Sequence, residues 1–230
     1  MRLILSLSLV ITSLFIFASY AYSDDEFAGK YRAYKNYVQS GSAAFQKKDY
    51  ASAIDNYSKA IEISPFEVTS YYNRGIAYYK SGKEKEAEVD FDKVIILDPR
   101  SSSAYVYRGL CKVKGGDYQG ALNDYKGALE LNPKDASIHN DLAWLYATAK
   151  DEKVKDNAKA LEHAVKASEL SNEKNAEILD TLARAYFING QVKEAIDAEN
   201  KALKIEPYND EFKNKLREYE KAIGKEERKQ

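Results

Sequence analysis

The chain has 230 residues, of which 31% are charged and 44% are hydrophobic, and its formal net charge at pH 7 is −1. Basic and acidic residues are therefore nearly equal in number. Binding to nucleic acid or to an anionic membrane surface requires a clustered excess of basic residues, which this composition does not support. The single cysteine, Cys111, excludes an intramolecular disulfide, so the sequence shows no dependence on an oxidising compartment. Cys111 itself is expected to be a small buried thiol.

The first 23 residues have the pattern of a secretory signal peptide. Arg2 gives a positive start, and the apolar run Leu3–Ala18 follows without a charge. Small residues and then acidic residues come next, which predicts cleavage after Ala21 or Ser23. The apolar run is shorter than the roughly 20 residues of a membrane-spanning helix. The sequence therefore predicts export, to the periplasm or the cell exterior; the alternative is an uncleaved segment that anchors the protein in a membrane.

From residue 34 onwards the sequence repeats with a period of 34 residues. Five kinds of position recur in the first three units: two small residues, an aromatic residue, a further apolar residue and a proline. In that order they are Gly41, Gly75 and Gly109; Ala53, Ala87 and Ala121; Tyr57, Phe91 and Tyr125; Ala60, Val94 and Ala128; and Pro65, Pro99 and Pro133. The pattern resembles the tetratricopeptide repeat (TPR). The resemblance implies an all-α fold, a right-handed α-solenoid of helix-turn-helix units that stack because one unit cannot bury its apolar face alone.

We expect about five TPR units, with a short lead-in before them and a capping helix and a charged tail after them. The lead-in covers residues 24–33, the array 34–207, the capping helix 208–224 and the tail 225–230, and the units lie at 34–67, 68–101, 102–135, 136–175 and 176–207. Gly82 and Gly116 are expected to give the turns left-handed backbone conformations, with Lys48 in the same position of the first unit.

The fourth and fifth units depart from the repeat. The fourth has five extra residues in the charged turn Lys150–Asn157, which is either a projecting functional loop or an ordinary solvated turn. In the fifth unit, Glu199 replaces the usual aromatic residue.

Two arginines occupy the position before the first-helix glycine, and each has an aspartate sixteen residues later. The pairs are Arg74 with Asp90 and Arg108 with Asp124. Because arginine occurs at this position only where aspartate follows, we predict two structural ion pairs between the two helices of the second and third units.

No catalytic or cofactor-binding pattern is present: the sequence has no glycine-rich phosphate loop, zinc-ligand spacing or nucleophile elbow. His139 and His163 are the only histidines, neither has a partner at a metal-binding spacing, and packing is the expected role of His139. We therefore expect no enzyme activity, no cofactor and no metal.

The TPR resemblance also implies a concave groove, lined by the first helices of successive units. The positions that face it are apolar or aromatic in the middle of the array. The predicted partner-binding residues are Phe45, Tyr72, Ile76, Tyr79, Leu110, Val113, Trp144 and Phe187. Such a surface suits an apolar peptide or an amphipathic helix. The alternative is that these side chains pack between neighbouring helices and bind nothing.

The sequence therefore predicts an exported scaffold for protein–protein interaction, which binds a peptide segment of a cell-envelope or secretion partner in its groove. The alternative function is a structural adaptor that self-associates or tethers through its outer faces. A clamp for the C-terminal carboxylate of cytosolic heat-shock chaperones is not expected. TPR clamps of that type use Lys, Asn, Asn, Lys and Arg where this chain has Val38, Ser42, Asn73, Ser103 and Tyr107.

Overall fold

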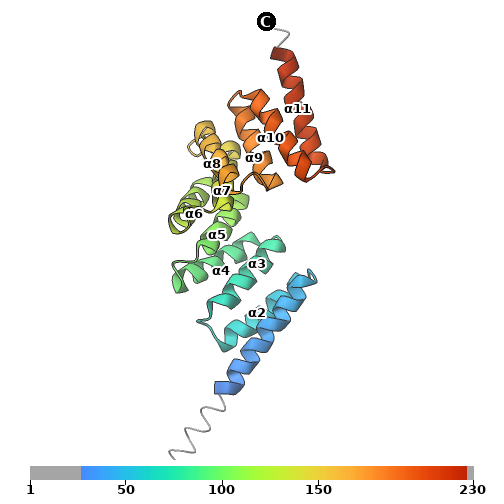
Figure 1. Cartoon of the computed structure of the whole chain (residues 1–230). Helices are drawn as coiled ribbons and strands as arrows, with labels where there is room; N and C mark the ends of the chain where they lie inside the picture. Colours follow the sequence, from blue (N-terminus) through green and yellow to red (C-terminus); the bar gives the residue numbers. More distant parts are fainter. Residues whose placement is uncertain (1–26, 227–230) are drawn as a thin grey trace, which may run out of the picture. The chain divides into compact units, whose positions relative to one another are not determined.

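A computed structural model describes residues 27–226 of the chain, with side chains up to residue 223. Within this range every regular element is an α-helix (Figure 1). The predicted signal peptide and the last four residues of the predicted charged tail lie outside the described residues. The chain forms two compact units, one ending at Leu97 and the other beginning at Asp98, and each is described by itself.

The first unit holds two helix pairs. A helix over residues 27–46 is followed by α2 (Tyr50–Ile63), α3 (Val68–Lys80) and α4 (Glu84–Leu97). The part of the predicted lead-in that the structure describes, residues 27–33, is helical and runs without a break into the first repeat helix. Helix α3 packs against both α2 and α4, so the two pairs stack on each other.

The second unit holds three further pairs and a final helix. Its elements are α5 (Ser102–Gly115), α6 (Tyr118–Leu131), α7 (Ala136–Thr148), α8 (Asn157–Leu170), α9 (Ala176–Ile188), α10 (Val192–Ile205) and α11 (Asp210–Glu226). Helix α7 packs against α6, α8 and α9, and α10 packs against α9 and α11. Over the described residues, the expectation of an all-α fold with five helix pairs and a final helix is confirmed.

Residues with a left-handed backbone conformation lie in the tight turns between the two helices of a pair, as the sequence predicts. The φ angles are 61° at Lys48, 78° at Gly82 and 83° at Gly116. Glycine adopts this region without the steric cost of a Cβ atom, whereas lysine bears a cost of roughly 1–2 kcal/mol. The left-handed residue ends the first helix, so that the second can turn back against it.

In each of the first three helix pairs, the repeated aromatic residue of the second helix packs its ring directly on the repeated glycine of the first helix. A Cβ atom added to Gly41 would lie 2.7 Å from Cε1 of Tyr57, and one added to Gly75 would lie 3.0 Å from Cε1 of Phe91. The absence of a side chain at these glycines therefore allows the close approach of the two helices. Alanine replaces the glycine in the fourth and fifth pairs, at Ala143 and Ala183, where the second helix carries no aromatic residue at the matching position.

The lengthened turn between α7 and α8 is anchored to its own helix pair. Val154 is only 1% exposed and belongs to the apolar cluster that contains Leu145 and Ala160. Asp156 accepts a hydrogen bond from the backbone N–H of Lys159 and so caps α8. The neighbouring Glu152 and Lys153 are exposed, so this segment is an ordered turn with its charges in solvent.

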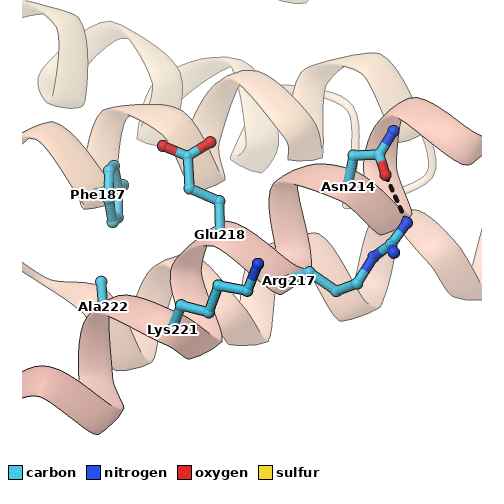
Figure 2. Close-up of a pocket in the computed structure, with 6 residues that line it drawn as sticks. All are labelled: Phe187, Asn214, Arg217, Glu218, Lys221 and Ala222. Atoms are coloured by element: carbon cyan, nitrogen blue, oxygen red, sulfur yellow. Dashed lines mark hydrogen bonds between the residues drawn. The ribbon is translucent and has the colours of Figure 1, made fainter.

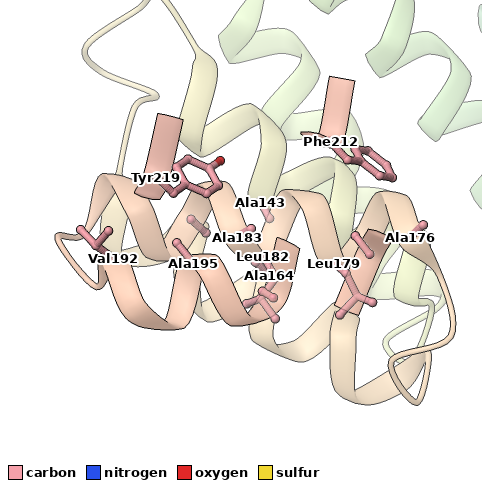
Figure 3. Close-up of a cluster of buried hydrophobic side chains, with 13 residues drawn as sticks. Ala143, Ala164, Ala176, Leu179, Leu182, Ala183, Val192, Ala195, Phe212 and Tyr219 are labelled. Carbon is pink, nitrogen blue, oxygen red and sulfur yellow. The ribbon is translucent and has the colours of Figure 1, made fainter. Parts of the chain in front are cut away.

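Helix α11 covers the last pair with two aromatic side chains. Phe212 and Tyr219 are 4% and 3% exposed, and they join the cluster drawn in Figure 3, whose other side chains come mostly from α9 and α10. Burying each ring contributes roughly 2 kcal/mol relative to leaving it in water. The capping role expected for the C-terminal helix is thus supported by the apolar side chains that it packs on the last pair.

Candidate protein-binding surface

Four of the predicted binding residues lie in the first unit and are half-buried. Phe45 lies on the helix over residues 27–46, while Tyr72, Ile76 and Tyr79 lie on α3. The Tyr72 ring meets the Phe91 ring edge-on at a centroid distance of 6.0 Å, and the Phe45 ring centroid lies 5.5 Å from that of Tyr50. These side chains pack within the unit on one side and keep accessible surface on the other.

Leu110, Val113 and Trp144 lie in the second unit, and Trp144 differs from its neighbours. Leu110 and Val113 of α5 are half-buried against an apolar cluster. Trp144 of α7 is 44% exposed, although the residues around it on the same helix are at most 3% exposed. Those residues are Leu142, Ala143, Leu145 and Tyr146. An apolar side chain of this size left in water beside a buried core is a candidate anchor for a partner.

Phe187 packs against the final helix and is half-buried. Its ring centroid lies 4.5 Å from that of Tyr219 on α11. Figure 2 shows the Phe187 ring beside a hollow lined by α11 residues. The hollow is bordered by Phe187, Asn214, Arg217, Glu218, Lys221 and Ala222. Phe187 is thus half-buried against α11 and borders this hollow, and its role in binding a partner stays a prediction.

The first predicted ion pair is present and nearly buried. Arg74 donates from Nε to Asp90 Oδ2 at 2.8 Å and from Nη2 to Asp90 Oδ1 at 2.7 Å. Its Nη1 donates to Ser58 Oγ at 2.9 Å, so the guanidinium joins α3 to both α4 and α2. Burial raises the pKa of Asp90, and the bonds from Arg74 oppose this shift. The ion pair with Arg74 thus stabilises the charged form of Asp90 in this buried position.

The second predicted ion pair, between Arg108 and Asp124, is also present, and it includes a second cation that the sequence analysis did not predict. Arg108 donates from Nε to Asp124 Oδ2 at 3.0 Å, and Lys112 Nζ lies 2.8 Å from the same oxygen. Lys112 is four residues after Arg108, so both cations lie on one face of α5. Asp124 is only 3% exposed, and two cations compensate its burial. The spacing of Lys112 from Arg108 was the available signal for it.

The two histidines of the chain meet each other, which the sequence did not predict. His139 Nδ1 of α7 lies 2.9 Å from His163 Nδ1 of α8, and His139 Nε2 lies 3.3 Å from the Pro133 carbonyl oxygen. That carbonyl can only accept, so His139 carries its proton on Nε2 and accepts from His163 through Nδ1. Burial, aided by His139, lowers the pKa of His163. The Tyr146 ring stacks on the His163 ring at a centroid distance of 5.8 Å.

Within residues 27–226, no group of three His, Cys, Asp or Glu side chains lies close enough together to hold a metal ion. The histidine pair brings two nitrogen donors together and no third. Cys111 is buried, in the position expected for a small packing residue. No helix of the described part of the chain has the length and hydropathy needed to cross a membrane.

The repeat assignment is tested by comparison with known families. Models described as "TPR repeat" match residues 41–82 and 109–149, and models described as "Tetratricopeptide repeat" match residues 68–101 and 176–209. The chain is a tetratricopeptide repeat protein. The matched ranges fall in the first three units, the first helix of the fourth and the whole of the fifth, and they leave out the lengthened turn with α8.

Solved structures show the same fold along most of this TPR chain. MamA from Desulfovibrio magneticus RS-1 is 22% identical, with a TM-score of 0.66, over 77% of this chain and 97% of that one. The thermophilic TPR protein TTC0263 of Thermus thermophilus is 20% identical, with a TM-score of 0.64, over 81% and 98%. YrrB, described as a TPR protein with an unusual peptide-binding site, is 20% identical, with a TM-score of 0.60, over 79% and 90%. At these identities the likeness shows the TPR fold alone.

Sequence relatives match only a short stretch. Hsp70-Hsp90 organizing protein 1 of Arabidopsis thaliana is 44% identical over 46 residues, and the protein of the same name from Glycine max is 40% identical over 45 residues. Each match covers 20% of this chain and 8% of the relative. The likeness therefore extends to little more than one repeat.

Proposed function

We propose that this TPR protein is an exported scaffold that binds a peptide segment of a cell-envelope or secretion partner on the face formed by its first helices. The observation that carries the proposal is the exposure of Trp144, which is 44% accessible on a helix whose adjacent residues are buried. A ring with an apolar body and a polar N–H can bury a large area against a peptide at low entropic cost.

The first unit offers a similar aromatic surface. Tyr72 and Tyr79 lie on one stripe of α3, with Ile76 between them. All three are half-buried, so their inner atoms are already fixed by packing and their outer atoms are accessible. Side chains held in place before binding lose less entropy when a partner docks.

The comparisons support a binding role without naming the partner. YrrB is described as having a peptide-binding site, and the name of the two plant relatives states that they organise Hsp70 and Hsp90. The chaperone-type clamp is not part of this proposal. Of the five positions that TPR clamps of that type use, only Asn73 has the expected residue.

A second candidate function, an adaptor that associates through outer faces, is favoured by a different observation. Val89 and Ile96 of α4 are 67% and 72% exposed and lie seven residues apart, so they share one side of the helix. Two apolar side chains in water on a second helix are consistent with self-association or with tethering. Sedimentation of wild type and a V89K/I96K variant tests it, because the adaptor function predicts an assembly that the variant loses.

Export is proposed from the N-terminal pattern alone. Intact-mass analysis of the protein from its native cells tests it, and the expected N-terminus is Tyr22 or Asp24. A chain that keeps Met1 and sediments with membranes would instead support the anchored alternative.

The experiment that tests binding places a photo-crosslinker at Tyr79, at Trp144 and, as a control, at the exposed Lys126 of α6. The expected result is that one partner is captured from Tyr79 and Trp144 and not from Lys126. Capture from Lys126 alone, or capture of a second copy of the chain, would favour the adaptor.

A further inference from the structure

Glu199 of α10 is fully buried and has no partner for its charge. The residue is 0% exposed, and neither Oε1 nor Oε2 has a hydrogen bond. It occupies the position at which the first three pairs have an aromatic ring, and the fifth pair has Ala183 in place of the glycine. A lone buried carboxylate is among the most unfavourable groups a core can hold, so the carboxyl is expected to be neutral there.

Charged groups around Glu199 come from α9 and α11. From α9 these are Asp180 and Arg184, and from α11 they are Glu211 and Lys215. Tyr219 of α11, with Glu218 beside it, also faces the site. The site thus lies at the contact between the last pair and its covering helix.

Lys215, the cation that α11 brings to this site, is already engaged by other carboxylates. Lys215 Nζ lies 2.7 Å and 2.8 Å from the two oxygens of Asp180 and 2.8 Å from Glu211 Oε1. Burial is the largest influence on the pKa of Glu199 and raises it to about 8; Asp180 adds to the rise, while Lys215 and Arg184 oppose it. Docking of α11 therefore buries a third carboxyl to which no cation bonds, because the lysine of α11 is bound to Asp180 and Glu211.

We propose that α11 is a releasable cap, and that its docking on α9 and α10 is controlled by the protonation of Glu199. When α11 is docked, Glu199 is buried and carries a proton. When α11 is released, water reaches the carboxyl, the proton dissociates at the ordinary pKa of a glutamate, and the apolar surface under Phe212 and Tyr219 is uncovered.

The direction of the pH effect follows from linkage. The docked pKa of Glu199, about 8, lies above its usual value of 4.5. Docking is therefore fully favoured below pH 4.5 and weakens as the pH rises towards 8. Glu211 acts in the opposite sense, because its bond to Lys215 lowers its pKa, but that effect falls below pH 4.5. Between about pH 5.5 and 7.5 the opening constant of α11 should rise by up to about tenfold per pH unit, or about 100-fold in all.

Amide hydrogen exchange in α11 measures this opening directly. The full chain is followed at about pH 5.5, 6.5 and 7.5, with rates corrected for the intrinsic pH dependence of exchange. The wild type is expected to lose protection in α11 by up to about 100-fold across this range, while α9 stays protected. In Glu199→Gln, which cannot ionise, and in Glu199→Met, protection should not change with pH.

Glu194→Gln is the matched control, because Glu194 is an exposed glutamate of the same helix. This variant should behave as the wild type does. Protection of α11 that is independent of pH in the wild type would overturn the proposal. So would a pH dependence in Glu199→Met equal to that of the wild type, because another group would then control the cap.

Discussion

The Tyr125 ring lies so close to Gly109 that a Cβ atom added to the glycine would be 2.5 Å from Tyr125 Cε1. Real Cβ atoms do not approach carbon so closely, so even the smallest side chain forces the ring or a helix to move. Gly109→Ala is expected to lower the free energy of unfolding by about 1–3 kcal/mol, the usual cost of overpacking. Chemical denaturation measures the change.

Gly115 provides the control for that substitution. It lies on the same helix, has an ordinary backbone conformation and would place a Cβ atom in open space. Gly115→Ala should stabilise the protein by up to about 1 kcal/mol through helix propensity. If the two variants were equally stable, the close contact between Gly109 and Tyr125 would not constrain the pair.

Arg74 and Asp90 are expected to stabilise the protein only as a pair. Arg74→Leu removes both bonds to a carboxyl that is 2% exposed, so it should cost on the order of 3 kcal/mol. The double variant Arg74→Leu/Asp90→Leu should be more stable than Arg74→Leu alone, because no buried charge remains. A double-mutant cycle by urea denaturation measures both.

The exposed pair Lys59–Asp55 is the control for the buried one. Its charged atoms lie 2.7 Å apart, as close as those of Arg74 and Asp90, but its side chains are 46% and 60% exposed. Solvent screens such a pair, so Lys59→Ala should have a much smaller effect than Arg74→Leu. A similar cost for Lys59→Ala and Arg74→Leu would show that burial does not set the strength of these pairs.

The histidine pair predicts a loss of stability in mild acid. Burial and His139 lower the pKa of His163 in the folded state, so the folded protein binds this proton less readily than the unfolded chain. The contribution of His163 to the free energy of unfolding is then complete above pH 6.5, the ordinary histidine pKa, and it is lost as the pH drops below that value. Thermal unfolding between about pH 7.5 and 5 measures the fall.

Asp141 and Glu199 titrate in the same range, since burial raises their pKa values to about 7 and about 8, and their contributions have the opposite sign. The relevant quantity is therefore the difference in stability between the wild type and His163→Gln at each pH, as thermal unfolding measures it. That difference should shrink below about pH 6.5. A constant difference would mean that His163 does not bind a proton on unfolding.

Trp144 should matter for binding more than for folding. Because the side chain is 44% exposed, Trp144→Ala should cost about 1 kcal/mol of stability or less, yet weaken partner capture at least about tenfold, as removal of a binding anchor does. Leu145→Ala, at a residue that is 0% exposed, should instead cost about 2–5 kcal/mol. Affinity and denaturation measurements on both variants separate the two roles.

The repeat pattern predicted features that depend on one fixed spacing. The positive φ angles of Gly82 and Gly116 and the bonds from Arg74 to Asp90 both follow from the 34-residue register. Each is set within one unit, where the helix-turn-helix geometry repeats.

Features outside the register could not be predicted in the same way. His139 and His163 meet across the unit in which five residues interrupt the period, so no other unit shows what those positions contact. Phe187 packs against α11, whose packing has no earlier copy in the chain. The sequence shows that Glu199 replaces an aromatic residue of the repeat. The lack of a hydrogen-bond partner for its carboxyl depends on Lys215 already binding Asp180, which the repeat does not predict.

A peptide-binding surface is tested most directly by the emission of Trp144 during titration with the peptide segment of the partner captured from Tyr79. Trp144 is the only tryptophan of the chain, so its spectrum reports one site. Burial of its exposed surface by the peptide predicts a saturable blue shift. Saturable binding by an independent method with no change in the Trp144 spectrum would contradict a peptide-binding surface built around this residue.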